Sequence, residues 1–349
     1  MAEPLPGTIP GQMTDELAPR TLEIAAEQSG RRLDQVLAEA FPQFSRSRLQ
    51  AWIADGRVRV DGAVRRCRDK VKAGEQVVLE PVVEASGELV AQPIPLRIVF
   101  EDEEILVLDK PADLVVHPAA GNPDGTLLNA LLHHAPQLAR LPRAGIVHRL
   151  DKDTTGLLVV AKTLTAHRSL VAQLHARTVR REYRALVSGV VVAGGRVDAP
   201  IGRHPTQRTR MAVVRDGRPA VSHYRVLERF AAHSLLAVRL ETGRTHQIRV
   251  HMAHVQHPLV GDPVYGGRVR VPKGASPRAG AALIAFPRQA LQAIALGLAH
   301  PRTGAPLHFE VPLAADLAAL LACLREEEVA DDALRAELDR PDLAGAAWR

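Results

Sequence analysis

The segment from Gly145 to Ala161 reads GIVHRLDKDTTGLLVVA, and it joins a charged loop directly to an apolar run. The apolar run at 156–161 indicates a buried strand. A loop anchored to such a strand holds its side chains rigidly at a sheet edge, where catalytic loops are commonly placed. Asp151 is therefore the first candidate for a catalytic carboxylate, although most loop aspartates only cap a turn.

A second polar cluster lies further along the chain, where residues 240–251 read LETGRTHQIRVH. The pattern predicts a strand that ends in a Thr-Gly turn, followed by a helix that Thr245 caps and that runs to Val255. Such a helix would bring Arg244 to the same edge as Asp151. Because a half-buried carboxylate needs a cation to stay ionised, and arginine keeps its proton, Arg244 is expected to pair with Asp151.

Between these clusters, residues 181–187 read REYRALV and predict a strand. This strand carries Tyr183, one of only three tyrosines in the chain. A tyrosine in such a place can stack on a base or move a proton. The alternative is ordinary half-buried packing with its hydroxyl in water.

Short apolar runs separated by Gly, Pro and Asn turns outnumber helices between Ile98 and Pro312. Strands are expected at 105–108, 156–161, 183–187, 222–227, 235–240, 283–286 and 291–298. Helices are expected at 127–132, after Thr165 towards Arg177, and at 245–255. Many neighbouring strands could pair as hairpins. The expected fold class is therefore α+β, with a mixed, largely antiparallel sheet and flanking helices.

Residues 31–80 predict a smaller α+β module. Leu33, Val36 and Leu37 mark one helix, Ser45 is a plausible N-cap for a second, and strands are expected at 58–60 and 76–79. Basic side chains concentrate on the second helix and the hairpin after it, which favours a phosphate-contacting surface over a merely solvated face. The candidate contacts are Arg46, Arg48, Arg57 and Arg59.

The 349-residue chain carries a formal net charge of +6, but its ends are acidic. Residues 1–30 hold one basic and five acidic side chains, and residues 325–349 hold four and eight, so the body at 31–324 carries +14. A body this basic suits a polyanionic partner. Aromatic residues make up only 3% of the chain, which argues against binding by stacking many bases.

Composition also predicts the organisation and location of the chain. Residues 1–30 are expected to be a disordered tail, with order beginning near Arg31, and 81–97 a linker. The large unit is expected at 98–320, followed by a charged tail at 321–349. Two distant cysteines and the lack of a membrane-length apolar run indicate a soluble, cytoplasmic protein.

The motifs together resemble pseudouridine synthases of the RluA type. The matching stretches are 148–158, 182–189, 243–251 and 257–266. The N-terminal module resembles the S4 RNA-binding domain, most visibly at 32–34, 45–47 and 58–62. An S4 domain ahead of the larger unit is the layout of the family members that act on large-subunit ribosomal RNA.

This resemblance implies isomerisation of uridine to pseudouridine: the N1–C1′ bond breaks, the base turns, and it rejoins through C5. It implies no cofactor and no metal. The expected partner is large-subunit rRNA or an assembling ribosomal subunit, bound by a monomer. Asp151 is implied to be essential, either attacking C1′, adding to C6 of the ring, or removing the C2′ proton.

The resemblance also assigns roles to the other candidates. Arg244 is expected to pair with Asp151, and Tyr183 to stack on the target base and help remove the C5 proton. Arg149 is expected to enter the RNA stack that the uridine leaves. The remaining expected RNA contacts are His148 and two apolar walls, Ile248 and Leu259, for which plain core packing is an equal alternative.

Three other functions compete with this one. The histidines at 246, 251, 254 and 257 suggest a metalloenzyme, but no HExxH pattern or cysteine supports zinc. A glycoside hydrolase needs two carboxylates flanking a bond, and Asp151 and Asp153 lie too close in sequence for that. A non-catalytic RNA-binding or ribosome-assembly factor would share the basic body but has no need of the three motifs.

Overall fold

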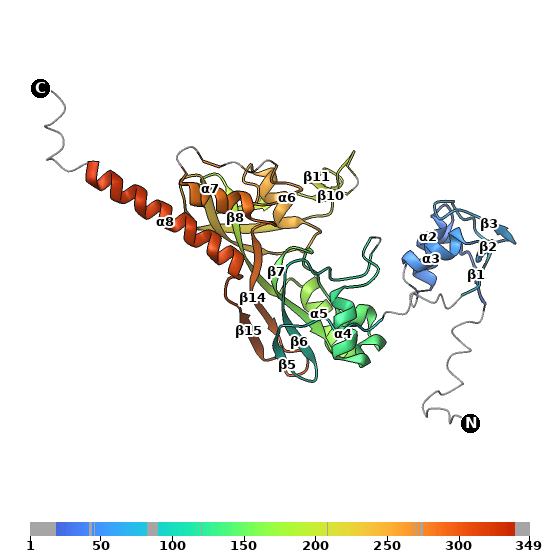
Figure 1. Ribbon diagram of the computed structural model, residues 1–349. Coiled ribbons are helices and arrows are strands. Elements are labelled where there is room, and N and C mark those ends of the chain that lie inside the picture. The colour runs from blue at the N-terminus through green and yellow to red at the C-terminus, as the bar shows by residue number, and fades with distance from the viewer. Residues whose placement is uncertain are drawn as a thin grey trace, which may run out of the picture. The chain divides into compact units, whose positions relative to one another are not determined.

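The computed structural model describes residues 19–41, 44, 46–81, 90–119, 121–207, 209–267, 269, 271–272 and 275–338. The chain divides into two compact units, and the division falls after Glu88, inside the stretch expected to be a linker. Figure 1 shows the smaller unit as a few short helices and strands, and the larger unit as a long sheet with helices packed against it.

The N-terminal unit is a four-stranded antiparallel sheet in the order β1-β4-β2-β3 with two helices packed on it. Its elements are β1 (Arg20–Glu23), a short 3-10 turn η1 (Ala26–Gln28), α2 (Leu33–Ala40), α3 (Arg46–Ala54), β2 (Val58–Val60), β3 (Ala63–Val64) and β4 (Gln76–Leu79). Apolar side chains from both helices and from β2 and β4 form one buried core. The expected helices and the strands at 58–60 and 76–79 are thus confirmed, while the expected cap Ser45 lies outside the described residues.

The expected start of order near Arg31 is wrong. β1 at Arg20–Glu23 pairs antiparallel with β4, and Ile24 is buried in the core of the N-terminal unit. A four-residue strand has little intrinsic stability, so its existence depends on β4, whose paired residues lie 53 to 59 positions further along the chain and which the local pattern does not reveal.

The large unit is built on a nine-stranded sheet in the order β5-β6-β7-β14-β8-β13-β12-β9, with β15 also paired to β14. Its strands are β5 (Ile98–Glu101), β6 (Ile105–Lys110), β7 (Thr155–Ala161), β8 (Arg180–Ser188), β9 (Gly195–Asp198), β12 (Val221–Arg229), β13 (His233–Leu240), β14 (Leu291–Ala299) and β15 (Pro306–Glu310). Among the strand pairs of the described residues only β7–β14 is parallel, so the expected mixed, largely antiparallel α+β fold is confirmed. A separate two-stranded ribbon joins β10 (Ile201–Arg203) to β11 (Met211–Val213).

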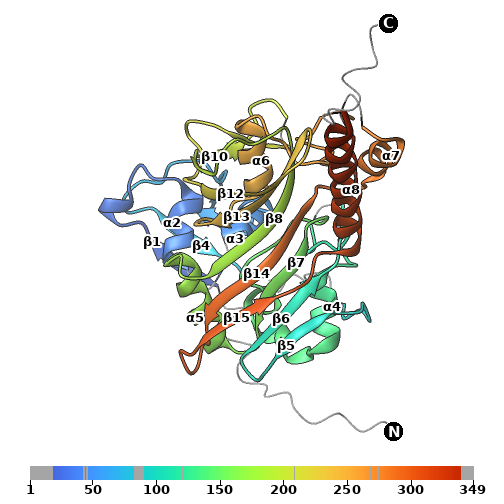
Figure 2. The same cartoon turned by 90° about the vertical axis from the view of Figure 1, so that its left-hand side faces the viewer.

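Helices cover both faces of this sheet, so its central strands, which carry apolar side chains on both sides, are buried. On one face α4 (Leu127–His134), two 3-10 turns (Pro136–Arg140 and Pro142–Gly145) and α6 (Gln247–His254) pack against β6, β7, β8 and β13. On the other, α5 (Leu164–His175) packs against β6, β7 and β14. Figure 2 shows α7 (Pro277–Ala285) and α8 (Ala315–Leu338) side by side at one end of the sheet, where their leucines share a core.

The strand expected at 283–286 is wrong, because these residues end α7 or follow it. The helix begins at Pro277, and the Ser276 hydroxyl accepts the backbone N–H of Ala279 as an N-cap. A short apolar run does not distinguish a buried strand from the buried face of a helix, and here Ser-Pro followed by an alanine-rich segment favours the helix. The domain end expected at 320 also falls inside α8, whose leucines at 317, 320, 321 and 324 are buried.

Gly156 allows β7 to lie against β14 at the start of the parallel pair. Its φ is +107°, and a Cβ built there would lie 2.0 Å from the carbonyl oxygen of Ala293. No side chain fits in this place without moving one of the two central strands.

We therefore expect Gly156→Ala to destabilise the large unit by about 3 kcal/mol or more, since it combines backbone strain with overpacking of a central strand pair. Gly121→Ala is the matched control: Gly121 also has a positive φ, +90°, but nothing lies within 4 Å of a Cβ there. The control should cost only about 1–2 kcal/mol. Denaturant unfolding curves give both values, and equal losses in the two variants would contradict the role of the close approach.

Candidate functional site

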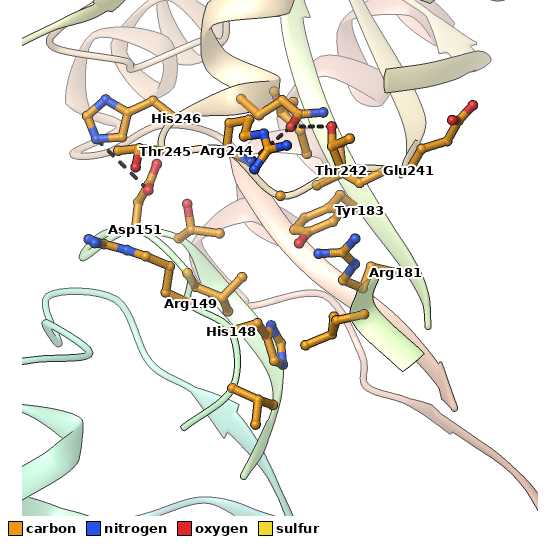
Figure 3. Close-up of a pocket in the computed structure, with 18 of the residues that line it drawn as sticks. His148, Arg149, Asp151, Arg181, Tyr183, Glu241, Thr242, Arg244, Thr245 and His246 are labelled. Carbon is orange, nitrogen blue, oxygen red and sulfur yellow. Dashed lines mark hydrogen bonds and ion pairs between the residues drawn. The ribbon is translucent and has the colours of Figure 1, made fainter. Parts of the chain in front are cut away.

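A pocket of about 770 Å³ is lined by the loop before β7, by β8, by the end of β13 and the start of α6, and by the C-terminal end of α5. Six of the residues expected from sequence to form the site line it: His148, Arg149, Asp151, Tyr183, Arg244 and Ile248. Figure 3 shows Asp151 pointing towards His246, while Tyr183 and Arg181 extend from the strand behind. Leu259 packs in the main core and is not among the described residues that line the pocket.

The charge partner of Asp151 is Arg249. Arg249 Nη1 donates to Asp151 Oδ2 over 3.0 Å, and the Asp151 side chain keeps 16% of its surface exposed to the pocket. Asp151 Oδ1 lies 4.0 Å from His246 Nε2. The carboxylate is therefore oriented through one oxygen, and its other oxygen faces the pocket.

Arg249 is itself held by a second carboxylate. Its Nε and Nη2 donate to Asp262 Oδ2 and Oδ1 over 2.7 and 2.9 Å, and Asp262 Oδ1 also accepts the backbone N–H groups of Val264 and Tyr265. Burial alone would lower the pKa of Arg249, but the bonds to Asp262 and Asp151 raise it above its ordinary value. This fork geometry is one that arginine provides and lysine does not.

The expected pairing of Arg244 with Asp151 is wrong. Arg244 lies in the turn before α6, where its Nε donates to the carbonyl oxygen of Pro219 over 3.1 Å. The helix starts later than expected: Gln247 is its first residue, and His246 precedes it with a left-handed φ of +57° and no side-chain cap, so Thr245 is not the cap. The side chain of Gln247 instead accepts the Arg244 N–H and bonds to β12.

The start of α6 at Gln247 explains why Arg249, and not Arg244, reaches Asp151. Gln247 is buried at the first turn of α6, and Arg249, 5% exposed, lies two residues further into the helix on its buried side. Both Arg249 and Asp262 belong to motifs recognised in the sequence. Which arginine pairs with Asp151 depended on the start of the helix, and helix ends are hard to place from sequence.

Three buried side chains anchor the loop that carries Asp151. Lys110 Nζ donates to the carbonyl oxygens of Pro111, Leu114 and Lys152 over 2.7–3.0 Å, and burial lowers the pKa of Lys110 to about 8. Arg288 donates to the carbonyl oxygen of Asp153, and Gln289 to the hydroxyl of Thr154. The loop that carries the carboxylate is therefore held in place by hydrogen bonds from these three side chains.

His246 closes the pocket beside Asp151. Its Nδ1 lies 2.9 Å from the hydroxyl of Tyr265, and that hydroxyl accepts the backbone N–H of Met211. Burial lowers the pKa of His246 despite the nearby Asp151, which favours a neutral ring at pH 7. A tyrosine hydroxyl that donates to Nδ1 leaves Nε2–H directed towards Asp151.

Tyr183 and His148 form the deeper part of the pocket. Tyr183 is 5% exposed, and burial raises its pKa, so its hydroxyl stays protonated at neutral pH. The backbone N–H of Val159 donates to His148 Nε2 over 3.0 Å, and burial, with Arg181 nearby, lowers the pKa of His148 to about 3. Because Nε2 accepts this bond and burial disfavours the charged ring, a neutral His148 is favoured, and a phosphate contact through its charge is not expected.

The exposed Arg149 lines the pocket and has no hydrogen-bond or ion-pair partner in the described part of the chain. In the N-terminal unit, Arg46 and Arg32 both donate to the fully buried side chain of Asp34. The pKa of Asp34 falls to about 2, because these bonds outweigh the opposing effect of burial. Arg59 is exposed, Arg57 is half-buried, and the side chain of Arg48 lies outside the described residues.

The histidine cluster does not form a metal site. His251 bonds to the Ser222 hydroxyl and the Ala199 carbonyl oxygen, and His257 to the carbonyl oxygen of Ser188, while His254 is exposed. In the described ranges, no three His, Cys, Asp or Glu side chains are placed to hold an ion. No helix among these residues is long and apolar enough to cross a membrane.

Comparisons with known proteins identify the family to which the chain belongs. Residues 104–254 match the RNA pseudouridylate synthase family and residues 31–77 match the S4 domain. The chain is 62% identical over 315 residues to ribosomal large subunit pseudouridine synthase D of Pseudomonas aeruginosa, covering 90% of this chain and 98% of that protein. It is 56% identical to the protein of the same name from Escherichia coli K12, over 88% and 94% of the two chains.

Among solved structures, human RNA pseudouridylate synthase domain containing 4 matches with a TM-score of 0.54 at 25% identity. That match covers 66% of this chain and 93% of the human one. Together with the two long, highly identical relatives, it confirms the resemblance seen in the motifs: this chain belongs to the RNA pseudouridine synthases, a family of isomerases, and carries an S4 domain ahead of the synthase unit.

Proposed function

We propose that this protein converts uridines of large-subunit ribosomal RNA to pseudouridine, with Asp151 as the essential carboxylate. The observation that carries the proposal is the placement of Asp151: it lies at the wall of an open pocket, ion-paired through one oxygen and accessible through the other. The substrate class is supported by the names of the two relatives, each of which is called a large subunit synthase. We also propose that it works in the cytoplasm, since both relatives are bacterial proteins and bacteria assemble their ribosomes there.

The reaction requires few chemical groups beyond the side chains that line the pocket. Breaking the N1–C1′ bond and rejoining the base through C5 involves no net oxidation and no hydrolysis, so the reaction needs no cofactor. A carboxylate can attack C1′, add to C6 or accept the C2′ proton, and each route uses an oxygen that faces the substrate. Asp151 Oδ1 supplies that oxygen while Arg249 holds Oδ2.

The other pocket residues fit the binding of a flipped nucleotide. Tyr183 lines the pocket and is proposed to stack on the uracil, while its raised pKa disfavours the phenolate that it would need to act as a base for the C5 proton. Ile248 supplies an apolar wall. Arg149 and Arg244 line the pocket as RNA contacts, and Arg149, without a protein partner in the described ranges, is suited to fill the gap in the RNA stack.

Replacing Asp151 by Asn tests the proposed catalytic role. Asn keeps the shape but cannot act as nucleophile or base, so pseudouridine formation in 23S rRNA should fall at least about 10³-fold while RNA affinity stays within about twofold of wild type. Mass spectrometry of nuclease digests gives the first quantity and filter binding the second. An unchanged yield from the variant would overturn the assignment of Asp151. If the wild-type protein itself forms no pseudouridine, it is an RNA-binding protein without catalytic activity.

Substitution by lysine distinguishes the roles of Arg249 and Arg244. Arg249→Lys keeps the charge but loses the fork that joins Asp262 to Asp151, so the single-turnover rate constant should fall about 10²-fold as the carboxylate loses its orientation. Arg244→Lys should change it by less than about threefold, since the backbone of residue 244, rather than its charge, holds the turn. Thermal unfolding of both variants controls for misfolding. The reverse order of effects would show that Arg244 is the partner after all.

The S4 unit is proposed to bind rRNA through basic side chains at positions 46, 48, 57 and 59. Arg57→Gln with Arg59→Gln should weaken binding and lower the slope of log affinity against log salt by about 1–2, since each lost phosphate contact removes a little under one unit. Arg65→Gln is the matched control, because Arg65 already donates to Glu75 over 2.8 Å. Equal salt slopes in all three proteins would argue against this surface.

A further inference from the structure

Arg181 is a buried arginine of the pocket that the mechanism above does not use. It lies on β8 two residues before Tyr183, so both side chains project from the same face of the strand. It is 8% exposed, lines the pocket, and its Nη1 would lie 2.8 Å from a Cβ built on Gly243. Figure 3 shows its guanidinium group next to the ring of Tyr183.

The guanidinium of Arg181 has no acceptor among the residues that the structure describes. Its Nε is buried without a hydrogen-bond partner, and the described residues offer Arg181 no hydrogen bond or ion pair. The other buried arginines of this region differ: Arg249 is bound to Asp262 and Asp151, and Arg288 to Asp316 and three carbonyl oxygens. A buried, uncompensated charge is costly, so its retention inside an open pocket points to an acceptor that arrives with the substrate.

The acceptor should itself carry a full negative charge. Arginine does not lose its proton, so a neutral carbonyl oxygen would leave the buried charge uncompensated. Two carboxylates are among the described residues that line the pocket, and both have other partners: Asp151 is paired with Arg249, and Glu241 is bound to Arg177 and His223 over 2.9 and 2.7 Å. The further arginines that line the pocket, at 143, 149, 177 and 244, also make this wall attractive to an anion.

The size of the pocket agrees with an anionic group that belongs to a bound nucleotide. Its volume of about 770 Å³ falls in the range of cavities that enclose whole drug-sized ligands, so it can hold the ribose and phosphate of a nucleotide as well as its base. We propose that Arg181 binds a phosphate group of the RNA backbone next to the flipped uridine. The proposal rests on the RNA pseudouridine synthase function and adds a fixed anchor for the backbone beneath Tyr183.

The test compares wild type, Arg181→Met and Arg181→Lys on a uridine-containing stem-loop transcript of 23S rRNA. Arg181→Met should weaken RNA binding about tenfold and lower the salt slope by about 0.7, as for one lost phosphate contact on an unpaired strand. The single-turnover rate constant at saturating RNA should stay within about twofold. Arg181→Lys should keep most of the affinity and the slope, since lysine also binds phosphate as a point charge.

Two controls separate this role from others. Arg239→Gln removes one charge from the opposite face of the same sheet, where Arg239 pairs with Glu182, and should leave affinity and slope unchanged. The thermal midpoint of Arg181→Met should equal or exceed that of wild type, because the guanidinium makes no hydrogen bond or ion pair to the described part of the chain.

Three results would overturn the inference: a lower rate constant with unchanged affinity, which assigns Arg181 to the reacting base; a lowered thermal midpoint, which assigns it to the fold; or no change at all. A wild-type protein that leaves the transcript unmodified would instead refute the proposed substrate, and the binding comparison is independent of that result.

Discussion

The site depends on one chain of ion pairs, Asp262–Arg249–Asp151. Asp262 is fully buried and satisfied by two backbone N–H groups and two guanidinium donors, so it fixes the plane of Arg249. Arg249 in turn presents one donor to Asp151. A buried ion pair contributes little to stability on its own, but it imposes one geometry. The role proposed for Asp151 requires a fixed orientation, whether the carboxylate attacks a carbon of the nucleotide or accepts a proton from it.

The fold supplies the rest of that orientation. β7 and β14 are the only parallel pair in the sheet, and Gly156 lets them meet closely just after the loop that carries Asp151. Lys110, Arg288 and Gln289 bind that loop from strands and turns far apart in sequence. These bonds hold the loop through groups other than the carboxylate of Asp151, which faces the pocket.

Much of this could be predicted from sequence because the signals are local. The buried strand at 156–161, the N-terminal helices and Tyr183 followed from apolar periodicity and short motifs. Arg249 could not be assigned, because the inward face of α6 depends on a helix start set by the left-handed His246 and by the contacts of Gln247 with β12. The strand expected at 283–286 failed for a related reason, since a short apolar run suits either a helix or a strand until its packing partner is known. β1 and the unpartnered state of Arg181 are likewise properties of tertiary structure and leave no local pattern.

A double-mutant cycle tests the central claim most directly. Single-turnover rate constants would be measured for wild type, Asp262→Asn, Arg249→Lys and the double variant. If Asp262 acts on the reaction through Arg249, the second change should add little once the first has been made, so the losses should be strongly non-additive. Losses that multiply independently would contradict the account, because Asp262 and Arg249 would then act separately and the chain of ion pairs would not orient Asp151.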